Sequence, residues 1–212
     1  MPNVILETKK LSFLNNIHYQ DIQILKDKVN FIVGSSGAGK STLLRLFNGM
    51  LTPSGGEIFY NGQRLTQIDT IELRKEISLI SQSVYLFDSS IRDNFRQFYE
   101  YRGMEVPSEE YMSKFLRMCQ IQFPFDKDCT TMSGGERQRV YTAIFLSFLP
   151  KVIMLDEPTS ALDKENSKKV IQNIVDFCKE KEISIIIVSH DNQIVDTFAE
   201  NIIRIGEEGD NE

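Results

Sequence analysis

The sequence contains no tryptophan, two histidines and three cysteines among its 212 residues. Cys119, Cys129 and Cys178 are dispersed and form no CxxC pair, which excludes a disulfide framework and indicates reduced thiols in a cytoplasmic protein. Long apolar runs are also missing, because the densest one, 183–188, is interrupted by Ser184. A membrane span needs about 20 apolar residues. We therefore expect any work at a membrane to be done through a partner.

The charge balance is acidic. Lys and Arg number 24 against 30 Asp and Glu, so the formal net charge is −6. This argues against a nucleic-acid partner held by bulk positive charge. The chain is 41% hydrophobic and 25% charged, as is usual for soluble globular proteins. Its length predicts a single domain, residues 1–212.

Short β-rich runs alternate with helical segments, a pattern that predicts an α/β fold with a largely parallel sheet. Apolar alternation within residues 4–25 favours antiparallel strands. We expect further strands at Val29–Val33, 57–60, 77–81, Val152–Asp156, 183–189 and 202–205. Helices are expected at 39–48, from Ser133 to about 149, and at Lys164–Glu180, with Gly49 and Asp163 as caps. Between about 83 and 131 the pattern predicts an inserted helical subdomain.

A glycine-rich segment after the first predicted buried strand fits G-x-x-x-x-G-K-[ST] and leads into a helix, the context of a phosphate-binding P-loop. Its backbone N–H groups and the helix N-terminus would cradle a polyphosphate. Lys40 would reach the β- and γ-phosphates, and Ser41 would bind Mg²⁺. The alternative is an ordinary glycine turn before a helix. The segment consists of Gly34, Ser35, Ser36, Gly37, Ala38, Gly39, Lys40, Ser41 and Thr42.

Two carboxylates stand at the carboxyl end of the apolar strand Val152–Asp156, where ligands bind in α/β proteins. Asp156 would help to hold Mg²⁺, and Glu157 could act as the general base for an attacking water. An acidic pair at a strand end can also be a solvated turn. Beside a P-loop, the pattern favours the catalytic interpretation.

A second glycine-rich turn, Met132 to Arg139, opens a second helix about two dozen residues before the acidic pair. It resembles the LSGGQ signature of the ABC (ATP-binding cassette) ATPases, with Met132 for Leu and Glu136 for Gln. The resemblance implies a head-to-tail homodimer, in which Ser133 and Gly135 close on the γ-phosphate held by the other chain's P-loop. A glycine pair that caps a helix is the structural alternative.

Three further motifs follow the same family in order and spacing. Gln82 matches the Q-loop glutamine, which the resemblance places at Mg²⁺ and the attacking water. Residues 160–163 match the D-loop that meets the opposite subunit. His190 matches the switch histidine at the γ-phosphate, although a lone histidine is more often structural. The resemblance implies a P-loop NTPase with a RecA-like mixed-sheet core, an antiparallel β subdomain and the inserted helical subdomain.

The segment before the P-loop departs from the family pattern. The aromatic residue that usually stacks on adenine is replaced at or near Asn15, and Phe13 and Tyr19 are the aromatic residues on either side. We take Phe13 as the adenine-stacking residue, although a core position suits it equally well. Asp27 stands where a glycine is usual.

These motifs predict an ATP- and Mg²⁺-dependent ATPase subunit of an ABC transporter, peripheral on the inner face of the cell membrane through a separate permease. The 86–95 run, the Met132 signature and the 148–152 segment most resemble small FetA-type (YbbL-type) cassettes, a group associated with iron export. A soluble non-transport cassette is the alternative. A P-loop kinase or GTPase is a further rival, but no guanine-specific NKxD-like run is present.

Overall fold

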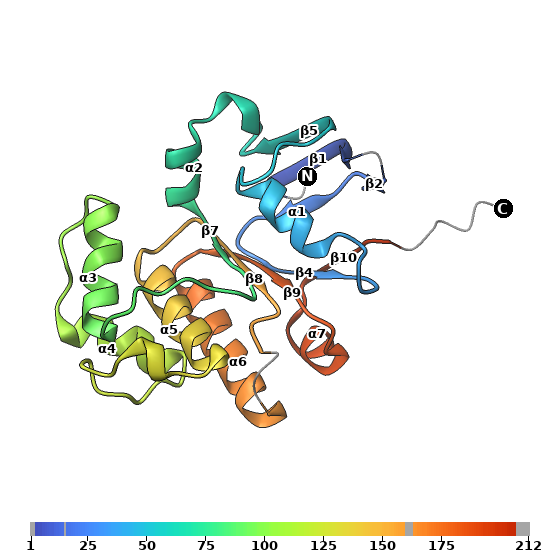
Figure 1. Ribbon diagram of the computed structural model, residues 1–212. Coiled ribbons are helices and arrows are strands. Elements are labelled where there is room, and N and C mark those ends of the chain that lie inside the picture. The colour runs from blue at the N-terminus through green and yellow to red at the C-terminus, as the bar shows by residue number, and fades with distance from the viewer. Residues whose placement is uncertain (1–2, 15, 160–162, 207–212) are drawn as a thin grey trace.

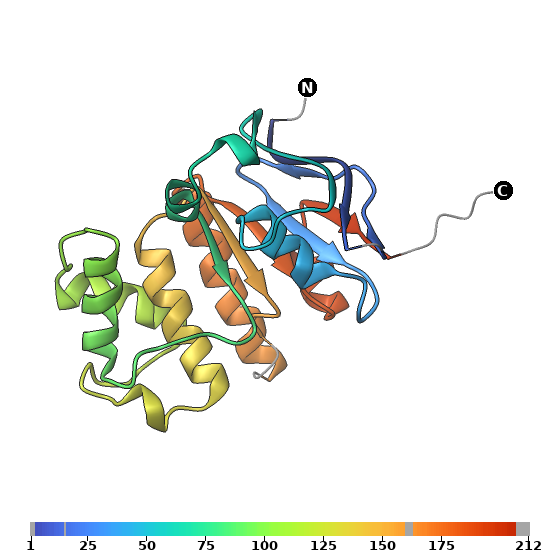
Figure 2. The ribbon, with the colours of Figure 1, turned by 45° about the horizontal axis from the view of Figure 1, so that its top comes forward.

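The computed structural model describes residues 3–14, 16–159 and 163–206, and places them in two sheets with helices between and beside them (Figures 1 and 2). The first sheet is antiparallel and has the order β2-β1-β5-β6, with β3 paired to β1. Its strands are β1 (Val4–Phe13), β2 (Ile17–His18), β3 (Gln23–Leu25), β5 (Gly55–Tyr60) and β6 (Gln63–Arg64).

The second sheet is parallel and has the order β10-β4-β9-β8-β7. Successive residues of its strands enter opposite cores: Phe31 and Ile153 pack on one face, Ile32 and Met154 on the other. Burial of both faces explains why these strands are almost continuously apolar. The strands are β4 (Val29–Val33), β7 (Ile77–Ile80), β8 (Val152–Asp156), β9 (Ser184–Val188) and β10 (Asn201–Arg204).

Helix α1 lies in the core between the two sheets, and the other large core covers the opposite face of the parallel sheet (Figure 2). Helices α3 to α7 contribute to this second core, with α4 packed against α5 and α6. The helices are α1 (Lys40–Phe47), α2 (Thr70–Glu76), α3 (Ile91–Tyr101), α4 (Glu109–Met118), α5 (Gly134–Ser147), α6 (Lys164–Glu180) and α7 (Asn192–Phe198).

The predicted strands and long helices are confirmed, with most boundaries shifted by one or two residues. The turn at Asn61 and Gly62 leads into β6, a two-residue strand that the pattern missed, as it missed α2 and α7. Segment 83–131 holds α3 and α4 but has no helix before residue 91, where Asn94 Oδ1 accepts from the Phe87 N–H at 2.8 Å. The division into one domain with a helical subdomain stays a prediction.

Among the described residues, no helix is both long and apolar enough to cross a membrane.

Asp27 lies in the turn between β3 and β4, at the start of the strand that leads to the P-loop. Its φ of 55° lies in the left-handed region, where glycine avoids the steric cost of a Cβ. Its Oδ1 atom is buried and has no hydrogen-bond partner among the described residues. Asp27 therefore lowers the stability of the fold in two ways, through its strained backbone and through its unpaired buried oxygen.

We expect Asp27→Gly to raise the free energy of unfolding by about 1 kcal/mol, because it removes the strain and the unpaired oxygen and adds only the chain entropy of glycine. Thermal unfolding should show a melting temperature about 2–4 °C higher. Lys168→Gly, inside α6, is the control and should cost about 1 kcal/mol. A loss of stability in Asp27→Gly comparable to that of the control would contradict this explanation of the turn.

Candidate nucleotide-binding site

Four of the predicted motifs follow four strands of the parallel sheet. The P-loop follows β4, Gln82 follows β7, Asp156 and Glu157 end β8, and His190 follows β9 (Figure 1). All four strands run in the same direction, so their carboxyl ends lie at one edge of the sheet. This is the edge at which open α/β sheets bind ligands.

Two glycines of the P-loop, at its start and just before α1, are required by the surrounding backbone. A Cβ on Gly34 would lie 2.1 Å from the Ile205 main-chain oxygen of the neighbouring strand segment. Gly39, the N-cap of α1, has a φ of 90°. The first N–H groups of a helix have no partner within the helix. Those of α1 are therefore available to phosphate oxygens, and the helix dipole favours such an anion.

Lys40 lies at the first position of α1 and is buried, with 7% of its surface exposed. Its Nζ donates to the main-chain oxygens of Gly34 at 2.9 Å and Ser35 at 2.8 Å, so the ammonium lies over the loop. Burial lowers the pKa of Lys40, while the negative charges of Glu157 and Asp156 oppose this shift. The same carboxylates therefore favour the charged lysine that a phosphate requires.

Asp156 is 5% exposed at the end of β8. Burial raises its pKa, whereas a hydrogen bond from Ser41 and the nearby cations lower it. A carboxylate beside a serine hydroxyl at a phosphate cradle is the donor set of Mg²⁺, which prefers oxygen ligands and completes its shell with phosphate and water. Within the described segments, no three His, Cys, Asp or Glu residues gather into a metal cluster. The residues present thus fit a nucleotide-bound Mg²⁺.

Glu157 and His190 lie in contact. The His190 Nε2 atom is 3.0 Å from Glu157 Oε1, and the Glu157 N–H donates to the Val188 oxygen at 3.0 Å. Glu157 has a φ of 50°, in the left-handed region that costs a non-glycine residue free energy. A cavity of about 230 Å³ opens beside the pair, lined also by Thr159, Lys164 and Ser167. The cavity leaves room for a water molecule beside the Glu157 carboxylate, whose role as proton acceptor stays a prediction.

The Gln82 side chain is exposed just beyond β7. Its strand end is fixed by Gln138 of α5, a residue to which the sequence analysis gave no role. Gln138 is 4% exposed, and its Nε2 donates to the main-chain oxygens of Ser81 at 3.4 Å and Asp156 at 3.5 Å. The sequence signal for this role was the position of a glutamine three residues after the glycine pair, on the buried side of the helix.

Ser133 is the N-cap of α5 and forms a capping box with Glu136. The Ser133 N–H and hydroxyl donate to Glu136 Oε2 at 2.8 and 2.9 Å, and these bonds lower the pKa of Glu136. Within the described part of the chain, neither Ser133 nor Gly135 shares a hydrogen bond with the P-loop. The capping role of this turn is therefore observed in the structure, and its contact with a phosphate stays a prediction.

Phe13 ends β1, where it is partly buried and packs against the core between the sheets. Its stacking on adenine stays a prediction. Asn15 and residues 160–162 of the predicted D-loop lie outside the described residues.

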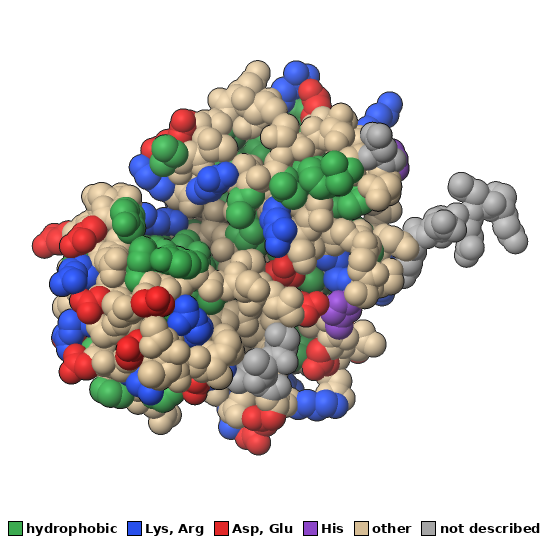
Figure 3. Space-filling view, in the orientation of Figure 1, with side chains coloured by type: hydrophobic (Ala, Val, Ile, Leu, Met, Phe, Trp, Pro, Cys, Tyr) green, Lys and Arg blue, Asp and Glu red, His purple; other side chains and the backbone are tan. Residues whose placement is uncertain are grey.

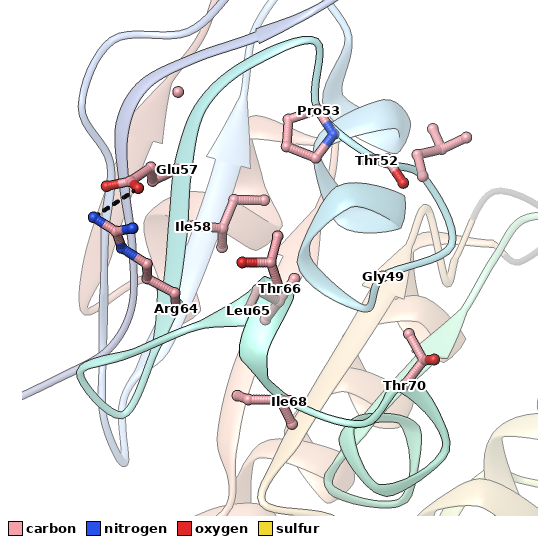
Figure 4. A pocket seen from close by; sticks show the side chains of 12 residues that line it. Gly49, Thr52, Pro53, Glu57, Ile58, Arg64, Leu65, Thr66, Ile68 and Thr70 are labelled. Carbon is pink, nitrogen blue, oxygen red and sulfur yellow. Dashed lines mark ion pairs between the residues drawn. The ribbon is translucent and has the colours of Figure 1, made fainter.

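A separate cavity of about 330 Å³ lies between the loop after α1, strand β5 and segment 64–70 (Figure 4). Glu57 and Arg64 form an ion pair across one side of it, with 3.0 Å between Oε1 and Nη2. None of the twelve residues that line this cavity belongs to the predicted phosphate site. The charged groups that suit a nucleotide are instead gathered at the edge of the parallel sheet.

Comparison with known proteins gives one family. The sequence profile described as "ABC transporter" matches residues 17–160. The chain is 33% identical over 201 residues to the phosphonates import ATP-binding protein PhnC of Wolinella succinogenes, covering 88% of this chain and 73% of that protein. It is 29% identical over 192 residues to the "Probable iron export ATP-binding protein FetA" of Escherichia coli, covering 91% and 84% of the two chains.

Solved structures agree with the sequence comparisons. The fold is similar to that of cbiO1 from Clostridium perfringens, part of the ABC transporter complex cbiONQ, with a TM-score of 0.81 at 29% identity over 96% of this chain and 85% of that one. A bacterial ABC transporter cassette solved as a dimer gives a TM-score of 0.83 at 25% identity, covering 95% and 94%. The chain therefore belongs to the ABC transporter family and has the fold of its ATPase cassettes.

Proposed function

We propose that the chain binds ATP with Mg²⁺ and hydrolyses it, as the energy-supplying subunit of a transporter whose permease is a separate polypeptide. The observation that carries this proposal is the meeting of the P-loop, Asp156 and the Glu157–His190 pair at one edge of the parallel sheet. A kinase or GTPase would share the P-loop. The glycine-rich turn of α5 and the family match favour the cassette over both.

In this mechanism, the N–H groups at the start of α1 and the Lys40 ammonium bind the β- and γ-phosphates. Ser41, Asp156 and Gln82 would hold Mg²⁺, whose charge offsets the negative charge of the phosphate oxygens. Glu157 accepts the proton of the attacking water, and His190, 3.0 Å away, orients this carboxylate. Phosphoryl transfer needs positioning more than covalent chemistry, so each of these residues acts by fixing an atom in place.

Ser133 and Gly135 are proposed to complete the site of a second copy in a head-to-tail homodimer. Their turn carries helix N-terminal N–H groups, which suit an anion. A cassette of similar fold was solved as a dimer, which supports the pairing of two copies. Closure would then be favoured by phosphate contacts that exist only in the paired state.

The proposed permease-binding surface is an aromatic patch formed by Tyr85, Phe87, Phe98 and Tyr101. Phe87 lies 5.2, 5.3 and 5.9 Å from the rings of the other three. Tyr85 and Tyr101 are 66% and 77% exposed, and hydrophobic side chains gather over this region of α3 and α5 (Figure 3). Exposed aromatic groups of this kind mark protein interfaces. The chain leads directly from Gln82 to Tyr85, which would connect the patch to the nucleotide site.

A permease bound at this patch would hold the chain at the inner face of the cell membrane, which is the location that we propose.

For the cargo we propose a metal ion, with iron export as the specific case. The support is the likeness to FetA, which this chain matches over 84% of that protein's length. Relatives that import phosphonates or methionine match at similar identity. Transport assays with the partner permease, comparing ferrous iron with these anions and amino acids, would decide the cargo.

Lys40→Ala should weaken ATP binding at least about tenfold, because it removes charge-assisted hydrogen bonds to phosphate. Equilibrium titration with Mg·ATP measures the dissociation constant. Lys75→Ala, an exposed lysine of α2, is the matched control and should leave it unchanged. An unaltered affinity in Lys40→Ala would remove this segment from its assigned role.

Glu157→Gln should lower kcat for ATP about 10²–10⁴-fold and leave the ATP dissociation constant within about threefold, because only the proton acceptor is lost. The measurement is steady-state phosphate release alongside nucleotide titration. Glu165→Gln, an exposed carboxylate in the first turn of α6, should retain wild-type turnover. Rapid hydrolysis by Glu157→Gln would exclude Glu157 as the general base.

Tyr101→Glu should abolish co-purification of the chain with its membrane permease, because it introduces a charge into an apolar contact. Ile202→Glu changes an exposed apolar residue of β10, outside the patch, and should co-purify as the wild type does. If the wild-type chain binds no membrane protein and still hydrolyses ATP, the soluble non-transport cassette would be the correct function.

A further inference from the structure

Tyr19 follows β2 in the antiparallel sheet, and its hydroxyl reaches the P-loop. Its hydroxyl donates to the main-chain oxygen of Gly39 at 2.9 Å. The ring is almost entirely buried, with 6% of the residue exposed, and the Tyr19 N–H donates to the Leu11 oxygen at 2.9 Å. Burial raises the pKa of Tyr19 to about 12, so the phenol keeps its proton and remains a donor.

The Gly39 carbonyl has two donors. Besides the Tyr19 hydroxyl, it accepts the Leu43 N–H at 2.8 Å as the first hydrogen bond of α1. The other half of the same peptide group is the Lys40 N–H, which lies at the open start of the helix. Donors on a peptide oxygen polarise the group and strengthen its N–H as a donor. The phenol is therefore linked through one peptide bond to an N–H that would meet a phosphate.

The contact also constrains the shape of the loop. A Cβ added to Gly39 would lie 2.7 Å from the Tyr19 hydroxyl and 3.2 Å from Ile17 Cγ2. The Tyr19 hydroxyl therefore packs directly against Gly39, which caps α1 and has a φ of 90°. On the other flank, a Cβ on Gly206 would lie 2.6 Å from Ala38 Cβ. The loop is thus confined between the antiparallel sheet and the segment after β10.

We propose that Tyr19 is a positioning residue for nucleotide binding: its hydroxyl orients and polarises the Gly39–Lys40 peptide so that the Lys40 N–H binds the polyphosphate. This inference rests on the proposed ATP site and adds to it a residue from a separate sheet. Tyr19 itself is too buried to touch a base or a phosphate, so its effect reaches the ligand only through Gly39.

The test compares Tyr19→Phe with Tyr99→Phe. Tyr99 is also buried, at 3% exposed, and its hydroxyl donates to the main-chain oxygen of Ser147 at 3.1 Å, far along the chain in the helical region. Each substitution keeps the ring and removes a buried hydroxyl with its hydrogen bonds, which for Tyr99 include a second one to the Ser147 hydroxyl at 2.9 Å. Each should therefore lower the melting temperature by a few degrees. The ATP dissociation constant separates the two roles.

We expect Tyr19→Phe to raise the Mg·ATP dissociation constant about three- to tenfold and Tyr99→Phe to leave it unchanged. Equilibrium titration of the full chain, without turnover, provides the readout. Equal affinities in the two variants, with similar losses of melting temperature, would overturn the inference and reduce Tyr19 to a packing residue. A wild-type chain that binds no Mg·ATP would instead overturn the proposed function itself.

A second variant tests whether the effect passes through Gly39. In Gly39→Ala the new Cβ displaces the Tyr19 hydroxyl, so the bond is already lost. Tyr19→Phe should then reduce ATP affinity by less in the Gly39→Ala background than in the wild type, as the two sites are coupled. Equal, additive losses in both backgrounds would contradict transmission through this carbonyl.

Discussion

The common direction of the parallel strands is the constraint on which the site depends. The neighbouring strands β4, β9, β8 and β7 all run in the same direction. The four segments that follow them therefore leave the sheet at the same edge. Residues far apart in the sequence, such as Lys40 and His190, are therefore placed at the same edge. The two-sided burial that keeps the sheet together also holds these strand ends in place.

The chemistry at that edge depends on charges held at unfavourable positions. Lys40 and Asp156 are both buried, and each favours the charged form of the other. Glu157 holds a left-handed backbone conformation, with its N–H tied to Val188 of the neighbouring strand. Such costs are sustained by the surrounding core. The buried charges and the strained backbone of Glu157 favour a site that is formed before its ligand arrives. Ligand binding would then require little free energy for rearrangement.

The sequence predicted the strands and long helices well because their signals are local: apolar runs such as Val29–Val33, and caps such as Asp163 before α6. Elements with short or weak patterns were missed. Helices α2 and α7 have seven residues each, although Asp69 and Asp191 cap them and were readable signals. Strand β6, with two residues, offered no pattern at all.

For the site, the motifs predicted which residues lie at the strand ends, because the P-loop and acidic-pair spacings carry that information. Contacts between distant segments were not predictable. The 3.0 Å approach of His190 to Glu157 and the Tyr19–Gly39 bond arise from the packing of separate strands and sheets. Gln138 lies within the second glycine-rich segment, but only the fold shows that it joins the ends of β7 and β8.

The most direct measurement is a structure of the protein with a non-hydrolysable ATP analogue and Mg²⁺. The account predicts a terminal phosphate within hydrogen-bond distance of Lys40 Nζ, the metal between that phosphate and Ser41 and Asp156, and the Ser133 turn of a second copy closed over it. A nucleotide bound elsewhere, such as in the cavity of Figure 4, or a terminal phosphate that remains far from Ser133 and Gly135 of every other copy, would contradict it.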